Sequence, residues 1–145
     1  MKTTDDPVVV EQTFDVSVEQ LWQAITDVTQ MRQWFFENIP SFEPEVGFET
    51  RFNIETGERD FLHVWRISEV VPSRLISCDW RYEGYAGNQL VTFELFDEGN
   101  QSRLRLTATV REGFQEGIPE FTREACLGGW QYFIQQSLKA YLQNK

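Results

Sequence analysis

The sequence predicts an α+β domain: a curved antiparallel β-sheet wrapped around a long C-terminal α-helix, with two short helices after the first strand. Three observations support this class. Residues 118–142 carry apolar side chains at the three-and-four spacing of a helix with one buried face. Residues 48–110 instead alternate polar and apolar, as strands with one solvated face do. Short turns separate these runs, so sequential strands are expected to pair as an antiparallel meander.

The elements before the sheet begin with a strand over residues 8–14. Ser17 is expected to cap the first helix, because Gln20 three positions later completes a capping box. This helix ends near residues 26–27. A second short helix over 29–36 ends before Pro40, since the residue before a proline is disfavoured in a helix. Five strands are then expected, at 48–55, 61–71, 75–82, 90–96 and 103–110.

Two adjacent glycines, Gly128 and Gly129, lie in the middle of the C-terminal helix next to Trp130. Each glycine inside a helix costs about 1 kcal/mol relative to alanine, so a helix that keeps both needs a reason. One interpretation is that the helix backbone packs closely on the sheet at this point. The other is that the helix forms one wall of a cavity. The glycines alone leave both interpretations open.

Length and charge limit the possible classes of protein. The 145 residues suit one domain, expected over 8–145 after a flexible tail of residues 1–7. The net charge of −10 argues against binding to nucleic acid or to anionic membranes. We expect no membrane insertion, because no apolar run approaches about 20 residues. The first residues lack the apolar core of a signal peptide, which predicts a cytoplasmic protein.

Few residues suggest catalysis or metal binding. His63 is the only histidine, so the common zinc sites are not expected, and we predict neither a metal nor another cofactor. His63 is the one candidate acid or base, although no serine or carboxylate has an evident relation to it. A satisfied strand histidine is the alternative. Cys78 and Cys126 are expected to be reduced thiols, and a disulfide between sheet and helix is the less favoured alternative.

Because side chains alternate between the two faces of a strand, a set of mostly aromatic residues is expected to face the C-terminal helix. With the facing residues of the helices, this set has the composition of a small-molecule pocket, which is largely apolar with a few polar groups. The same residues could instead fill a solid core, and periodicity does not separate the two. The predicted lining is Trp34, Phe35, Phe52, His63, Trp65, Cys78, Trp80, Phe93, Leu95, Leu106, Cys126, Gly129, Trp130 and Phe133.

Three segments resemble motifs of the START-like (SRPBCC, helix-grip) superfamily. VSVEQLWQAITDVTQMRQWFF at 16–36 is similar to the opening of the branch named for the activator of the heat-shock-protein-90 ATPase. ISEVVPSRLISCDW at 67–80 resembles its strand, proline turn and strand, and GGWQYFIQQSLKAYL at 128–142 its C-terminal helix. The resemblance covers residues 8–143. The chain departs from the family at Ser17, where a proline is usual, and in the turn EGNQS at 98–102.

This resemblance implies a cavity between sheet and helix that binds apolar or amphipathic small molecules, but it implies no reaction. Three functions follow as hypotheses. The first is a non-enzymatic domain that binds a small hydrophobic molecule, lipids included. The second is an enzyme of the cyclase or dehydratase kind that uses the same cavity, with His63, an inward Thr or Tyr82 as acid or base. The third is a protein-interaction module related to co-chaperones, with a protein partner that the sequence does not identify.

Overall fold

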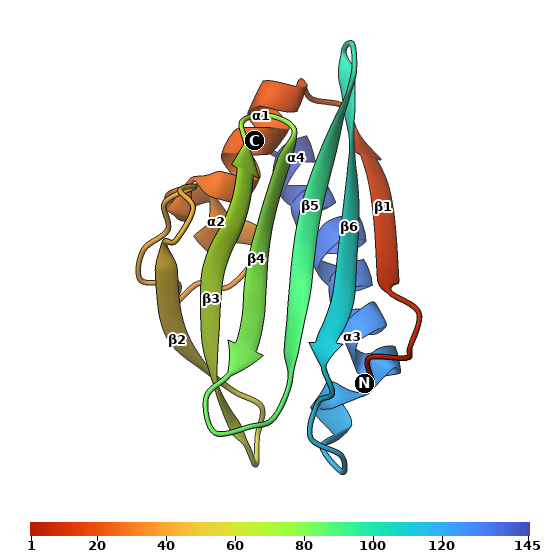
Figure 1. Ribbon diagram of the computed structural model, residues 1–145. Helices are drawn as coiled ribbons and strands as arrows, with labels where there is room; N and C mark the ends of the chain where they lie inside the picture. The colour runs from red at the N-terminus through yellow and green to blue at the C-terminus, as the bar shows by residue number, and fades with distance from the viewer.

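A computed structural model describes residues 1–145 and confirms the predicted fold class (Figure 1). Six antiparallel strands form one sheet in the order β1-β6-β5-β4-β3-β2, and the helices lie on one of its faces. The strands are β1 (Val8–Phe14), β2 (Glu49–Glu55), β3 (Asp60–Val71), β4 (Leu75–Tyr82), β5 (Asn88–Glu98) and β6 (Gln101–Glu112). The helical elements are α1 (Val18–Thr26), α2 (Val28–Trp34), η1 (Pro119–Phe121), α3 (Arg123–Trp130), η2 (Gln131–Leu138) and α4 (Lys139–Gln143).

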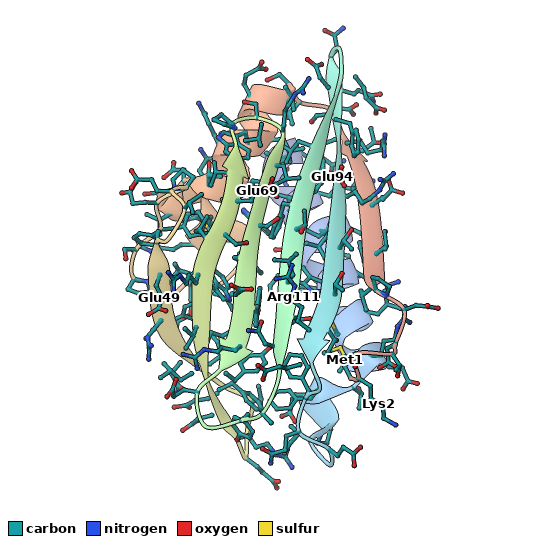
Figure 2. All side chains as sticks on the ribbon, viewed as in Figure 1. Met1, Lys2, Glu49, Glu69, Glu94 and Arg111 are labelled. Atoms are coloured by element: carbon teal, nitrogen blue, oxygen red, sulfur yellow. The ribbon has the colours of Figure 1, made fainter.

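The meander from β2 to β6 is as predicted, and β1 returns to pair with β6 at the opposite edge from β2. Inward and outward side chains alternate along the strands, which is the burial that strand parity predicts. Two irregularities interrupt the ladder: a register shift between Ile67 and Glu69 opposite β4, and another between Asn88 and Gln89 opposite β6. Charged side chains such as Glu69 and Glu94 lie on the outward face, turned to the viewer in Figure 2.

The two short helices begin at the caps that the sequence indicates. The Ser17 hydroxyl accepts from the Gln20 backbone N–H at 3.2 Å, and the Gln20 side chain accepts from the Ser17 N–H at 3.2 Å. Asp27 ends α1 and also caps α2, because its carboxylate accepts from the Thr29 N–H at 3.1 Å. The second helix therefore begins one residue earlier than predicted. It also ends two residues earlier, since Phe35 leaves helical geometry with ψ −109°.

The C-terminal helix is composite rather than one regular α-helix over 118–142. Thr122 is extended and caps α3, so the helix proper begins at Arg123 after the single turn η1. Its middle eight residues form η2, a π-helix, before α4 completes the element. π-helical turns are rare and occur mostly as short insertions in α-helices. None of the helices is both long enough and apolar enough to cross a membrane.

The N-terminal residues make several hydrogen bonds with the segment that follows β6. Figure 2 shows Met1 and Lys2 beside the start of the C-terminal helix. The Met1 ammonium donates to the Phe121 carbonyl at 2.9 Å, and the Met1 carbonyl accepts from the Phe114 N–H at 2.9 Å. The Arg123 guanidinium donates to the carbonyls of Asp6 and Pro7, both at 3.1 Å. These bonds place Met1 beside η1 and α3. The flexibility of residues 1–7 stays a prediction.

Candidate functional site

The predicted lining divides between two cavities that lie under different helices. The narrow cavity, beside α2, has a volume of about 20 Å³. That is room for about one water molecule. It is lined by Ile25, Met31, Trp34, Phe35, Phe42, Trp65, Ile67, Ile76, Ser77, Cys78, Trp80 and Phe93. Six of the predicted lining residues, Trp34, Phe35, Trp65, Cys78, Trp80 and Phe93, therefore lie where almost no space is left.

Aromatic side chains from the end of α2 fill this region. Trp34 and Phe35 stack with their ring centroids 4.7 Å apart, and Phe35 stacks on Trp65 at 5.3 Å. The Trp34 indole also donates to the Ala24 carbonyl at 2.8 Å, which fixes the ring against α1. Stacked rings at these distances form a solid core. Here the core interpretation of the aromatic set holds.

The wide cavity, about 140 Å³, lies under α3 and η2, at the end of the sheet where Figure 1 shows the N-terminus. It is lined by Met1, Phe36, His63, Trp80, Tyr82, Gln89, Glu120, Phe121, Ala125, Cys126, Gly129, Trp130 and Phe133. Six predicted residues are among them: His63, Trp80, Cys126, Gly129, Trp130 and Phe133. The remaining predicted residues, Phe52, Leu95 and Leu106, are buried but line neither cavity.

Several members of this lining are absent from the predicted set, although the sequence already places Tyr82 on the same strand face as Trp80. Tyr82 and Gln89 lie on the inward face of β4 and β5, in register with His63 and Trp80 respectively. Strand parity identifies both, because Tyr82 is two residues from Trp80 and Gln89 is four residues from Phe93. Met1 and Glu120 lie outside the sheet, and no periodic pattern points to them.

Gly128 and Gly129 do not pack closely against any other part of the chain. A Cβ atom added at either position would meet no atom within 4 Å outside its own helical segment. The close-packing interpretation is therefore wrong. Gly129 instead borders the wide cavity, whereas Gly128 is exposed and lies outside the lining. The missing side chain at Gly129 helps to leave this space open.

His63 is buried at the wide cavity and is electrically neutral at neutral pH. Its Nδ1 lies 2.9 Å from the Phe61 carbonyl oxygen, so Nδ1 carries the proton and donates it. Nε2 is left as an acceptor and makes no hydrogen bond within the chain. Burial lowers the pKa of His63 from 6.5 to about 4, against a smaller opposing effect of the Phe61 bond.

The other polar groups inside the wide cavity are also uncharged. Burial raises the pKa of the Cys126 thiol to about 11 and raises the pKa of Tyr82 well above its ordinary value. The Cys126 sulfur lies 4.0 Å from Gln89 Oε1, and Cys126 and Cys78 are both free thiols. The Trp80 indole nitrogen is buried without a hydrogen-bond partner. The interior thus offers unpaired donors and acceptors but no charge.

Charged groups at the wide cavity are confined to its rim and already have partners. Glu120 accepts from the Thr56 hydroxyl at 2.6 Å and pairs with Arg59 at 3.3 Å. The Met1 ammonium is bonded to the Phe121 carbonyl. No group of three His, Cys, Asp or Glu side chains lies close enough together to hold a metal ion.

Comparison with solved structures finds the same fold in proteins of low sequence identity. A protein of the dynemicin biosynthetic locus superposes with a TM-score of 0.76 at 22% identity, over 96% of this chain and 48% of that chain. The chain thus spans about half the length of that protein. A Rhizobium loti protein superposes with a TM-score of 0.75 at 22% identity, over 94% of this chain and 96% of that chain. The Aha1 dimer from Colwellia psychrerythraea superposes with a TM-score of 0.71 at 20% identity, over 95% of this chain and 96% of that chain.

At these identities the superpositions establish the fold alone. A comparison with curated protein sequences gives no match. The family described as "Activator of Hsp90 ATPase homolog 1-like protein" matches residues 15–143, nearly the whole chain. This match agrees with the helix-grip architecture and with the three motifs in the sequence. The chain therefore belongs to the Activator of Hsp90 ATPase homolog 1-like family, a branch of the START-like superfamily.

Proposed function

We propose that this protein binds a small hydrophobic or amphipathic molecule in the wide cavity and does not transform it. The observation that carries this proposal is the space of about 140 Å³ enclosed by aromatic side chains under Gly129. An apolar cavity of about 150 Å³ is large enough to take benzene. Ala125 is exposed and also lines the cavity, so the space reaches the surface beside α3.

The volume favours a ligand of about one ring, or one ring of a larger molecule that extends through the mouth. A whole sterol or fatty-acid chain needs more room than about 140 Å³, so its entry requires displacement of Phe36 or Phe133 from the lining. Those two rings lie 5.1 Å apart and face each other edge to face. Lipid binding is therefore the less favoured form of this proposal.

Binding without reaction fits the chemistry of the cavity better than catalysis. With a pKa of about 4, His63 is a weak base at neutral pH, and no carboxylate orients its ring. The raised pKa values of Tyr82 and Cys126 make both groups weak acids and keep the thiol from acting as a nucleophile. An acid–base enzyme needs groups whose pKa values lie near the operating pH.

A protein-interaction module would need a contiguous apolar surface. The large apolar side chains that are exposed, Val9, Val46, Val71 and Tyr132, come from four different segments of the chain. Four exposed side chains are few for a docking patch of several hundred Å². We therefore place small-molecule binding before a co-chaperone-like role.

The test compares two leucine variants at the adjacent glycines. In Gly129→Leu the new side chain enters the wide cavity, whereas in Gly128→Leu it points to solvent. Benzene, toluene and indole are titrated into each protein, and amide NMR shifts of Gln89 and Trp130 are followed. We expect saturable shifts in the wild type and in Gly128→Leu, and none in Gly129→Leu. The proposal fails if none of the probes, nor a fatty acid or sterol, shifts these resonances in the wild type.

A further inference from the structure

The wide cavity holds polar atoms that a pure hydrocarbon would leave unpaired. We infer that its ligand is an uncharged, single-ring aromatic molecule that carries a hydroxyl group, with the hydroxyl between Trp80 Nε1 and His63 Nε2. The inference rests on the proposed binding function and narrows it to one chemical class, phenol-like molecules.

The donor is the Trp80 indole N–H. Trp80 is 5% exposed, and its Nε1 makes no hydrogen bond. A buried donor without a partner destabilises the fold, so such atoms are rare in proteins unless a water or a ligand pairs with them. The indole N–H is near enough to the Tyr82 hydroxyl to lower the pKa of that group, although the pair does not have the geometry of a hydrogen bond. Trp80 Nε1 therefore lies on the side of its ring that faces Tyr82, and Tyr82 lines the wide cavity and not the narrow one.

The acceptor is Nε2 of His63. Because Nδ1 donates to the Phe61 carbonyl, the lone pair is on Nε2, and no group of the chain donates to it. The rings of His63 and Trp80 are 5.5 Å apart at their centroids and are inclined by 60°. One hydroxyl oxygen between them accepts from Trp80 and donates its proton to His63. A methyl group in the same place satisfies neither atom.

The surrounding side chains favour an aromatic body for the ligand. Trp80 and Trp130 meet edge to face at 5.4 Å, and Phe36 and Phe133 do so at 5.1 Å. These pairs present both ring faces and ring edges, which are the surfaces that aromatic rings pack against. The cavity volume of about 140 Å³ allows one such ring.

The cavity discriminates against charged ligands, because its interior has no ion to pair with them. His63, Tyr82 and Cys126 are all uncharged at neutral pH. The two charged groups of the rim already have partners. The Met1 ammonium donates to the Phe121 carbonyl, and the Glu120 carboxylate accepts from Thr56 and pairs with Arg59. An unpaired charge in an apolar site carries a large desolvation cost.

The experiment compares four one-ring probes at pH 7: phenol, anisole, toluene and benzoate. Phenol can donate and accept a hydrogen bond, anisole can only accept one, and toluene can do neither. Benzoate carries a negative charge. Dissociation constants come from calorimetry and from the Gln89 amide shift. We expect phenol to bind roughly tenfold more tightly than toluene, which corresponds to two modest hydrogen bonds. Anisole should lie between them, and benzoate should bind least.

Two substitutions at His63 separate the polar contact from packing. His63→Phe keeps a ring and removes the acceptor, so phenol should lose most of its advantage while toluene binding stays within about twofold. His63→Gln keeps an acceptor and should retain part of the preference. If His63→Phe does not fold, Trp80→Phe provides the comparison, because it keeps a ring, removes the donor and should also reduce the preference for phenol.

The outcomes distinguish this inference from the proposed function. Equal affinity for phenol and toluene, or tight binding of benzoate, overturns the hydroxyl-bearing neutral ligand while leaving a hydrophobic binding site in place. A phenol preference that survives in both His63→Phe and Trp80→Phe also overturns it. If no probe binds at all, the proposed function fails as well.

Discussion

The narrow and wide cavities lie on the same sheet and have aromatic walls of the same kind, yet side chains fill the first almost completely and leave about 140 Å³ in the second. Trp80 lines both. The strands do not cause the difference, because their inward residues are large in both regions. The helices do: α2 ends in Trp34 and the chain continues into Phe35, whereas α3 presents Ala125, Cys126 and Gly129. Small helix residues opposite a ring-rich sheet leave the space open.

The two regions also differ in polarity. The narrow cavity is lined almost entirely by apolar residues, and Ser77, its one polar residue, is bonded to Thr92 at 2.9 Å. The wide cavity brings together His63, Tyr82 and Gln89. The buried Trp65 indole nitrogen at the narrow cavity also lacks a partner, so the contrast lies in the number of polar side chains and not in unpaired atoms. A few polar groups in a largely apolar wall are typical of a small-molecule pocket. The comparison leads to four predictions.

Truncation of a ring should cost more stability in the narrow region than in the wide one. Trp34 is 2% exposed and hydrogen-bonded, so Trp34→Ala should lower the free energy of unfolding by about 3–5 kcal/mol. Phe133 is half-buried beside existing space, so Phe133→Ala should cost about 2 kcal/mol. Urea unfolding measures both. Tyr132→Ala, which removes an exposed ring, is the control and should change stability by about 0.5 kcal/mol or less.

Acidification should destabilise the protein through His63. Its pKa is about 4 in the folded state against 6.5 ordinarily, so the unfolded chain binds the proton first as the pH falls. Stability should therefore decrease from about pH 6.5 to about pH 4, by about 3 kcal/mol in total, and this contribution should be constant below that.

Urea unfolding of the wild type and of His63→Gln at several pH values isolates this contribution. Carboxylates such as Glu11 and Glu83, whose pKa values are lowered by Arg103 and Arg81, titrate in both proteins and cancel in the difference. The wild type should lose stability relative to the variant across this pH range. Parallel curves would mean that His63 is not buried in its neutral form.

The sequence predicted the sheet, the capping box at Ser17 and the inward face of each strand, because these depend on local periodicity and hydrogen bonding. It did not distinguish the narrow from the wide cavity. That difference depends on which helix lies opposite each strand segment and on the π-helical turn at η2. Neither feature can be predicted from apolar residues that repeat every two positions in a strand or every 3.6 in a helix. Gly129 was the strongest local signal, yet close packing on the sheet explained it as well until the space around it was known.

Alanine at the two glycines tests that space directly. Gly128→Ala and Gly129→Ala should each raise the free energy of unfolding by about 1 kcal/mol, because both positions are helical and a Cβ meets nothing within 4 Å. Thermal or urea unfolding gives the values. Only the Gly129 variant should also weaken the binding of toluene, since its methyl group enters the wide cavity. Destabilisation by Gly129→Ala would restore the close-packing interpretation.

The two cysteines report on the two regions separately, because each lies in one of them. Cys126 is half-buried at the wide cavity with a pKa of about 11, and Cys78 is buried at the narrow one with a pKa of about 12. Iodoacetamide at pH 8 should modify both slowly, since the thiolate is the reactive form, and should modify Cys126 first.

Peptide mass spectrometry follows each site, and in urea the two rates should become equal. A saturating aromatic ligand should slow the reaction at Cys126 and leave Cys78 unchanged. Equal rates in the folded protein would show that the narrow region opens as readily as the wide one.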